Sequence, residues 1–294
     1  MAMPHFAVHQ PASLEEALDL VARHRTSVKL LAGGTDLVMK LRAGALRPEN
    51  LVSLNRVAGL NRINYRDDDG LVIGAGARIS DVAAHPDVQR HYPALAHACR
   101  VMATTQIRNM GTVAGNIVNA APSADTAAPL LAYKASVVLV ERGGRRQVDL
   151  TKFFQGPGLT AIEPLEILEA IRVPAPPQRV GSAYQRLSAR SKVDIAAVGV
   201  AGFLALDLQG DIIGARLALS AVAPTPVRCP EAERMLDGQT PSAELFSRAA
   251  AACVRAARPI DDVRATANYR RAMVAVLARR VLNACLAMAQ GGAR

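Results

Sequence analysis

Apolar and polar positions at the start of the chain alternate first with the period of a strand and then with that of a helix. Residues 5–9 alternate strictly, which is typical of a short strand. Ser13 and Glu16 form a capping box, and the apolar residues that follow recur at helical spacing, which predicts a helix over 14–24. A second apolar strand, 28–32, comes next. The pattern predicts a compact strand, helix, strand unit.

Apolar periodicity also predicts strands and helices in the rest of the first half of the chain. It predicts strands at 51–54, 71–74, 137–140 and 147–150, and helices at 37–41, 80–85 and 93–102. Residues 104–121 differ from these elements, because they are rich in Gly, Asn, Thr and small apolar residues and carry one charge, Arg108. This composition favours tight, irregular backbone over either regular period.

A cluster of prolines marks the expected domain boundary. Residues 167–173 alternate as a strand, and Pro174, Pro176 and Pro177 then interrupt the chain. Beyond them the pattern predicts an antiparallel sheet followed by two alanine-rich helices, with strands at 183–187, 196–206 and 212–222 and helices at 242–257 and 269–288. The second half is therefore expected to be a small α+β unit.

Composition argues against a nucleic-acid partner. The chain of 294 residues has 35 Lys+Arg and 25 Asp+Glu, a net charge of +10, and each half contributes +5. There is no basic arm, and only 3% of the residues are aromatic, which leaves few rings for bases to stack on. An arginine-rich, solvated surface is the simpler interpretation.

The four cysteines and the apolar segments indicate a reducing compartment and no membrane span. Cys99, Cys229, Cys253 and Cys285 are dispersed, which fits small buried side chains better than a zinc site or a disulfide framework. The start of the chain lacks the pattern of a signal peptide, and the apolar stretch 195–206 is too short to cross a bilayer. We expect a cytoplasmic protein.

Common catalytic motifs are missing from the sequence. It has no HExxH, GxSxG or P-loop motif, and the six histidines lack metal-ligand spacing, so we expect no metal site and no catalytic side chain. Gly74 and Gly76 follow a strand, yet Ile79 stands where a dinucleotide fingerprint has its third glycine.

Two glycine-bearing loops remain as candidates for ligand binding. They are Ala32-Gly33-Gly34-Thr35-Asp36 and Gly111-Thr112-Val113-Ala114-Gly115-Asn116, and each sets glycines beside a threonine hydroxyl. Such loops let a ligand approach the backbone closely while N–H and O–H groups donate to it, so two of them could clasp a pyrophosphate. Ordinary turns at the ends of strands are the alternative.

Four strings in the sequence resemble the FAD-binding subunit of the molybdenum hydroxylases, the family of xanthine dehydrogenase and carbon monoxide dehydrogenase. They are LLAGGTDL (30–37), QIRNMGTVAGNIVNAAPSADTAAPLLA (106–132), EILEAIRVP (166–174) and ARSKVDIAAVGVA (189–201). The similarity covers nearly the whole chain, and the 106–132 string is the most specific.

The resemblance implies FAD as the cofactor and implies which residues bind it. Two loops would wrap the pyrophosphate and adenosine, and Asp125 would hold adenosine or ribityl hydroxyls. Segment 186–195 would border the isoalloxazine ring. There, Lys192 or a neighbouring arginine would set positive charge near the reduced flavin, and Ile195 would stack on the ring. The implied cofactor-binding residues are Lys29, Leu30, Leu31, Ala32, Gly33, Gly34, Thr35, Asp36, Leu37, Ala103, Thr104, Gly111, Thr112, Val113, Ala114, Gly115, Asn116, Asp125, Leu168, Lys192 and Ile195.

The resemblance also implies an α+β architecture of the vanillyl-alcohol-oxidase (PCMH) type. Residues 1–175 would form the FAD-binding domain, with subdomains 1–55 and 56–175. Residues 178–288 would form a C-terminal domain with a three-stranded antiparallel sheet and helices, like that of carbon monoxide dehydrogenase flavoproteins. Because the cysteines are dispersed, no additional iron–sulfur cluster is expected in this chain.

The implied function is electron transfer within a larger enzyme. A [2Fe-2S] small subunit and a molybdenum-cofactor large subunit would be the partners, in a dimer of heterotrimers, and electrons would pass from the clusters through FAD to NAD⁺, oxygen or a quinone. Two alternatives are a self-sufficient flavin oxidoreductase and a non-enzymatic assembly module that has lost the cofactor.

Overall fold

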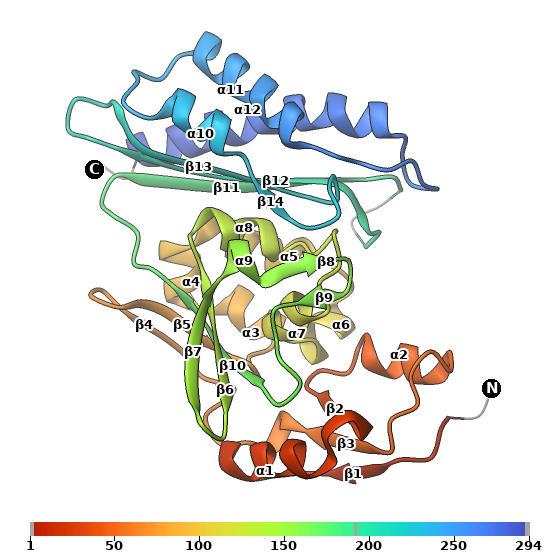
Figure 1. The fold of residues 1–294 in the computed structure, drawn as a ribbon. Helices are drawn as coiled ribbons and strands as arrows, with labels where there is room; N and C mark the ends of the chain where they lie inside the picture. The colour runs from red at the N-terminus through yellow and green to blue at the C-terminus, as the bar shows by residue number, and fades with distance from the viewer. Residues whose placement is uncertain (1–2, 191–192, 292–294) are drawn as a thin grey trace.

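The computed structural model describes residues 3–190 and 193–291, which stack in three tiers (Figure 1). The N-terminal tier carries a small parallel sheet, the middle tier a five-stranded sheet covered by short helices, and the C-terminal tier a sheet under three helices. The expected α+β architecture with a C-terminal antiparallel sheet is confirmed.

The N-terminal tier forms because one amphipathic helix covers a short parallel sheet. Its strands, in the order β1-β3-β2, are β1 (Ala7–His9), β3 (Asn50–Ser53) and β2 (Val28–Leu31). Helix α1 (Leu14–His24) begins where the Ser13 hydroxyl accepts a hydrogen bond from the Glu16 amide, as the capping box predicted. Helix α2 (Leu37–Arg42) follows β2, and the turns η1 (Arg25–Ser27) and η2 (Leu54–Arg56) complete the tier.

The middle tier is built on an antiparallel sheet in the order β4-β5-β10-β6-β7. Its strands are β4 (Ile63–Arg66), β5 (Gly70–Gly74), β6 (Ser136–Glu141), β7 (Gly144–Asp149) and β10 (Ile167–Val173). The helices are α3 (Ile79–Ala84), α4 (Pro86–His91), α5 (Pro93–Val101), α6 (Thr105–Met110), α7 (Val113–Val118), α8 (Ala127–Ala132) and α9 (Leu150–Phe153). A small hairpin of β8 (Phe154–Gly156) and β9 (Leu159–Thr160) lies beside them.

The expectation of irregular backbone over 104–121 is wrong, because α6 and α7 occupy most of that stretch. Threonine hydroxyls cap both helices: Thr104 accepts from the Ile107 amide at 3.2 Å, and Thr112 accepts from the Gly115 amide at 2.9 Å. Glycine and asparagine have low helix propensity, so the composition did not indicate these two helices. The helices are stabilised instead by their N-caps and by packing.

The C-terminal tier has one more strand than the sequence indicated. β11 (Val180–Ser188), β12 (Ala196–Leu206) and β13 (Ile212–Ser220) pair antiparallel, and the two-residue strand β14 (Val227–Arg228) extends the sheet. Helices α10 (Pro230–Leu236), α11 (Ala243–Ala256) and α12 (Ala267–Gly291) cover one face of this sheet (Figure 1).

The other face of the C-terminal sheet packs on helices α5 and α8 of the middle tier. Tyr92 and Tyr133 contact edge to face at 5.2 Å between ring centroids, and Tyr133 contacts Phe203 of β12 in the same way at 6.1 Å. The guanidinium of Arg216 lies 3.6 Å from the Phe203 ring centroid and donates to the Ala132 carbonyl at 2.5 Å. These contacts fix the C-terminal sheet against the middle tier.

Helix α12 is long and apolar enough to cross a membrane by length and composition, with a mean hydropathy of 1.6 over its most apolar window. In the structure it lies along β11 and β12, and one of its faces belongs to the core of the C-terminal tier. The buried side chains of that face are Arg270, Val274, Leu277, Ala278, Val281, Leu282, Cys285 and Ala289. This packing makes α12 the central core helix of its tier, and the absence of a membrane span stays a prediction.

Candidate functional site

The two glycine-bearing loops lie in direct contact. A Cβ atom built on Gly33 would fall 2.2 Å from the carbonyl oxygen of Met110 and 2.6 Å from the Cα of Gly111. No side chain fits in that space, so glycine at position 33 allows the two backbones to touch. The structure therefore joins two segments that are about 80 residues apart in the sequence, as a shared ligand site requires.

The first loop presents its backbone between the end of β2 and the start of α2. Gly34 has a φ of +72°, which glycine adopts without strain, and its carbonyl accepts from the Val38 amide at 2.9 Å. Among the described residues, none accepts a hydrogen bond from the amides of residues 33–36. A row of amides at the start of a helix suits the oxygens of a phosphate.

The second loop is hydrogen-bonded on one side to the backbone that follows β5 and on the other side to the buried side chain of Thr126. The carbonyl of Gly111 accepts from the Ile79 amide at 2.9 Å, and residues Arg78 and Thr112 form an isolated β-bridge. The Thr126 hydroxyl donates to the side-chain carbonyl of Asn116 at 2.6 Å. These bonds fix the loop, and because the Thr112 hydroxyl caps α7, the Gly115 amide is already used within the chain.

Asp125 lies beside this loop and is 7% exposed. The Tyr184 hydroxyl donates to one of its carboxylate oxygens at 2.6 Å, and Arg186 donates to the other at 3.3 Å. Burial raises the pKa of Asp125, although the charge of Arg186 and the hydrogen bond from Tyr184 oppose the shift. The carboxylate is thus part of a buried polar cluster.

Arg186 connects three segments at this cluster. Besides Asp125, its guanidinium donates to the carbonyl of Val101 at 3.2 Å and to the carbonyl of Asp194. Sequence reasoning named segment 186–195 but missed the roles of Tyr184 and Arg186 in holding Asp125. Their i, i+2 spacing on a predicted strand sets both side chains on one face, which was the available signal.

The remaining predicted residues differ in how far they are buried. Ala103 has a φ of +47° and its carbonyl accepts from Arg108 at 2.9 Å. Leu168, in β10, is 4% exposed, whereas Lys29 is exposed on β2 and Ile195 is 49% exposed. Lys192 lies outside the described residues.

The described residues contain no group of three or more His, Cys, Asp or Glu side chains that could hold a metal ion. The four cysteines are buried and unpaired. The centre of the site offers backbone amides and threonine hydroxyls as hydrogen-bond donors and one buried carboxylate as an acceptor. The donors suit the oxygens of a pyrophosphate, and the carboxylate suits ribityl or ribose hydroxyls, so the groups fit a dinucleotide.

Two family models match the chain. Residues 4–176 match the FAD binding domain in molybdopterin dehydrogenase, and residues 182–285 match the CO dehydrogenase flavoprotein C-terminal domain. Together they span both parts of the structure on either side of the proline cluster.

Known proteins resemble the chain over nearly its whole length. It is 35% identical over 288 residues to the carbon monoxide dehydrogenase medium chain of Hydrogenophaga pseudoflava, covering 98% of this chain and 99% of that one. It is 34% identical over 284 residues to a putative xanthine dehydrogenase FAD-binding subunit of Escherichia coli K12, covering 96% and 97%.

Solved structures agree with these relatives. A carbon monoxide dehydrogenase structure from Hydrogenophaga pseudoflava superposes with a TM-score of 0.93 at 36% identity, covering 98% of this chain and 99% of the other. Quinoline 2-oxidoreductase from Pseudomonas putida 86 superposes with a TM-score of 0.90 at 27% identity, covering 99% of each.

Proposed function

The chain belongs to the family of FAD-binding medium subunits of molybdenum hydroxylases, and from this we propose that it carries electrons from a [2Fe-2S] partner subunit to an external acceptor. The chain binds FAD and is an oxidoreductase subunit. FAD, when bound, accepts and releases the electrons. The protein's residues bind, orient and shield it. The proposed acceptors are NAD⁺, oxygen or a quinone.

The contact between the two glycine loops is the observation that carries the proposal. Gly33 and Gly111 touch through their backbones, so the amides of residues 33–36 and the amides of Thr112 and Ala114, for which the described residues show no acceptor, can face one pyrophosphate. We propose that the FAD site comprises Lys29, Leu30, Leu31, Ala32, Gly33, Gly34, Thr35, Asp36, Leu37, Ala103, Thr104, Gly111, Thr112, Val113, Ala114, Gly115, Asn116, Asp125, Leu168, Lys192 and Ile195.

Asp125 can accept hydrogen bonds from hydroxyl groups of FAD while it keeps its protein partners. A carboxylate offers about four acceptor positions, and Tyr184 and Arg186 use two of them. Arg186 also sets positive charge within the buried cluster. We propose that Asp125, held by Arg186, orients the hydroxyl-bearing part of FAD. We also propose that no side chain acts as a catalytic acid or base.

The medium subunits among the relatives belong to enzymes with further subunits. We propose that this chain assembles with a [2Fe-2S] small subunit and a molybdenum-cofactor large subunit, as a dimer of heterotrimers in the cytoplasm. We also propose that the chain divides at the proline cluster into an FAD-binding domain, 1–175 with subdomains 1–55 and 56–175, and a C-terminal domain, 178–288.

The complex purified through this chain is expected to release FAD on denaturation and to contain iron and molybdenum together. Flavin absorbance, metal analysis and the native mass measure this directly. A flavin-bearing chain that oxidises a substrate without iron or molybdenum partners would indicate the self-sufficient oxidoreductase. A complex that retains activity but releases no FAD on denaturation would indicate an assembly module.

A further inference from the structure

The end of strand β13 contacts the segment of the middle tier that leads into Asp125. The amide of Ala221, the residue that follows β13, donates to the carbonyl of Pro122 at 2.7 Å. Pro122 lies in a tight turn, in which the Ala124 amide donates to the Ala121 carbonyl at 3.0 Å. Asp125 directly follows this turn. A shift of Ala221 would therefore displace segment 121–125 and the carboxylate at its end.

Ala221 has a backbone conformation that residues with a Cβ atom rarely adopt. Its φ is +64°, in the left-handed region that glycine enters freely. Such a conformation persists only where the surrounding structure fixes it. Here the Ala221 amide donates to Pro122 and the Ala221 carbonyl accepts from Arg270, so both polar groups of its backbone are held.

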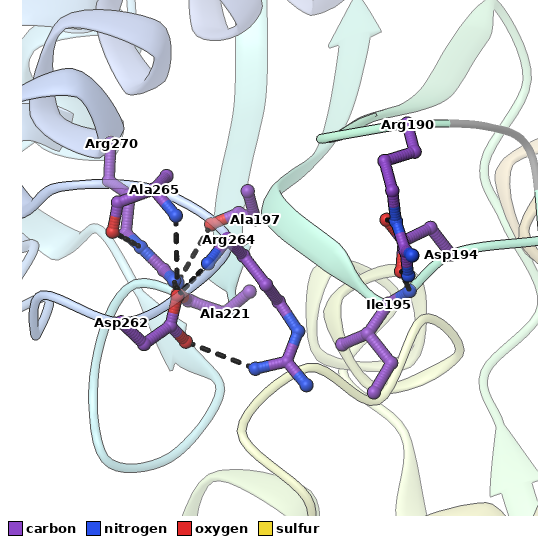
Figure 2. A network of polar contacts seen from close by, with 9 residues as sticks. All are labelled: Arg190, Asp194, Ile195, Ala197, Ala221, Asp262, Arg264, Ala265 and Arg270. Atoms are coloured by element: carbon purple, nitrogen blue, oxygen red, sulfur yellow. Dashed lines mark hydrogen bonds and ion pairs between the residues drawn. The ribbon is translucent and has the colours of Figure 1, made fainter.

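Arg270, at the start of α12, fixes Ala221 from inside the C-terminal tier (Figure 2). Its guanidinium donates to the Ala221 carbonyl at 2.7 Å, to the Ala197 carbonyl at 3.1 Å and to the Asp262 carboxylate at 2.6 Å. The residue is 4% exposed. Because the guanidinium is planar, these bonds also fix the two carbonyls relative to each other.

Asp262 keeps Arg270 in this position. Burial raises the pKa of Asp262, but hydrogen bonds from the Arg264 and Ala265 amides and from Arg270 outweigh burial and lower it to about 2. Asp262 is therefore charged at neutral pH, and it matches the charge of the buried arginine. The ion pair fixes the guanidinium that holds Ala221.

A second contact joins the same end of β13 to Asp125. Ser220, the last residue of β13, and Tyr184 of β11 both lie against Gly199. A Cβ atom built on Gly199 would fall 2.2 Å from the Ser220 hydroxyl oxygen and 2.8 Å from the Tyr184 hydroxyl oxygen. Tyr184 in turn donates to Asp125 at 2.6 Å. Two consecutive residues at the end of β13 thus contact the immediate surroundings of Asp125.

We infer that Arg270 is a positioning residue for FAD: through Ala221 it holds segment 121–125 where Asp125 can meet the hydroxyls of the cofactor. The inference rests on the proposed function, in which Asp125 binds these hydroxyls. Arg270 itself lies outside the proposed cofactor-binding residues. The C-terminal tier thereby contributes to a site whose backbone donors come from the other two tiers.

The test is the FAD affinity of the purified complex after the substitution Arg270→Lys. Lysine keeps the positive charge beside Asp262, but its ammonium is a compact point charge and lacks the guanidinium fork that reaches both carbonyls. We expect FAD to bind about tenfold more weakly, because Ala221 loses a hydrogen bond from a charged group and segment 121–125 loses its support. The FAD that stays on the complex after serial dilution measures the affinity.

Arg228→Lys is the matched control. Arg228 forms a partly buried ion pair with Glu233 in the same tier, at 2.6 Å, and its side chain is 17% exposed. Among the described residues, its side chain donates to Glu233 and to no residue of segment 121–125. We expect unchanged FAD affinity in this variant.

A glycine at position 221 distinguishes positioning from a loss of stability elsewhere. Glycine adopts a φ near +64° without support from Arg270, so adding Ala221→Gly to Arg270→Lys is expected to recover FAD affinity about threefold. The same substitution in the wild-type chain is expected to gain less, because Arg270 already fixes the residue there. Circular dichroism verifies that each variant is folded.

Unchanged FAD affinity in Arg270→Lys, an equal loss in Arg228→Lys, or no recovery with Ala221→Gly would each overturn the inference. If Arg270→Lys does not fold, Asp262→Asn provides the comparison: it keeps the accepting oxygen, removes the charge that holds Arg270, and should weaken FAD binding about threefold. Asp125→Ala tests the proposed function separately. Full FAD affinity in Asp125→Ala would contradict the proposed site, whereas weak binding there beside unchanged binding in Arg270→Lys would overturn the inference alone.

Discussion

Replacing Gly33 with valine is expected to weaken the binding of FAD to the protein. The new Cβ would lie 2.2 Å from the Met110 carbonyl oxygen and 2.6 Å from the Cα of Gly111, so one loop must move away from the other. Both neighbours are backbone atoms, which cannot rotate aside as a side chain can. Because amides from both loops are proposed to bind one pyrophosphate, their separation removes the donors of one loop.

The expected loss of FAD affinity follows from the free-energy cost of inserting a larger side chain into a packed site. Overpacking costs about 1–3 kcal/mol, which corresponds to FAD binding about fivefold to 150-fold weaker. Flavin absorbance per chain after gel filtration measures the retained FAD, and titration of the stripped protein gives its affinity.

Gly143→Val is the matched control for this substitution. Gly143 lies in the hairpin turn between β6 and β7, and the nearest atom to a Cβ added there is a flexible Glu141 carboxylate oxygen at 3.6 Å. We expect full flavin content in this variant. Full flavin content in Gly33→Val, with circular dichroism showing a folded chain, would contradict the proposal that the two loops share the cofactor.

Replacing Arg186 with methionine is expected to destabilise the protein by about 3–5 kcal/mol at neutral pH, because it leaves the carboxylate of Asp125 buried without its cation. The two side chains are 8% and 10% exposed, and their closest N–O distance is 3.3 Å. Methionine keeps much of the length and volume of arginine but removes the charge. Urea unfolding followed by circular dichroism measures the change in the free energy of unfolding.

The loss of stability caused by Arg186→Met should be smaller at acid pH than at neutral pH. Burial already raises the pKa of Asp125 in the folded protein, and without Arg186 the pKa rises further. The folded state then binds a proton more tightly than the unfolded state, so the stability contributed by Asp125 is complete below the unfolded pKa and is lost as pH rises through the folded pKa. The gap between variant and wild type should therefore narrow in acid and widen toward neutral pH.

Two further variants distinguish the effect of the unpaired buried charge from a general effect of removing the arginine side chain. The double variant Asp125→Asn with Arg186→Met has no buried charge, so it should be more stable at neutral pH than Arg186→Met alone. Arg145→Met breaks an exposed pair with Glu169, in which the arginine side chain is 62% exposed, and should cost no more than about 1 kcal/mol. A pH-independent loss in Arg186→Met would show that packing, not the stranded charge, is responsible.

Local sequence patterns determined the N-terminal unit and the three long strands of the C-terminal sheet. The capping box at Ser13 starts α1, and the apolar run 196–206 is β12 to the residue. Each of these signals lies within a few residues, so no distant contact was needed to interpret it. The glycine loops were found in the same way, as glycines beside threonine hydroxyls, and the family resemblance gave them a cofactor.

Tertiary structure decided what local patterns could not encode. The contact of Gly33 with Met110 and Gly111, the pairing of Asp125 with Arg186 and the hydrogen bond from Arg270 to the Ala221 carbonyl join residues that lie far apart in the sequence. Helices α6 and α7 were missed because their stability comes from threonine caps and packing rather than from residue preference. The sequence thus determined the elements and the loop chemistry. The site itself depends on distances and burial, which exist only once the tiers pack.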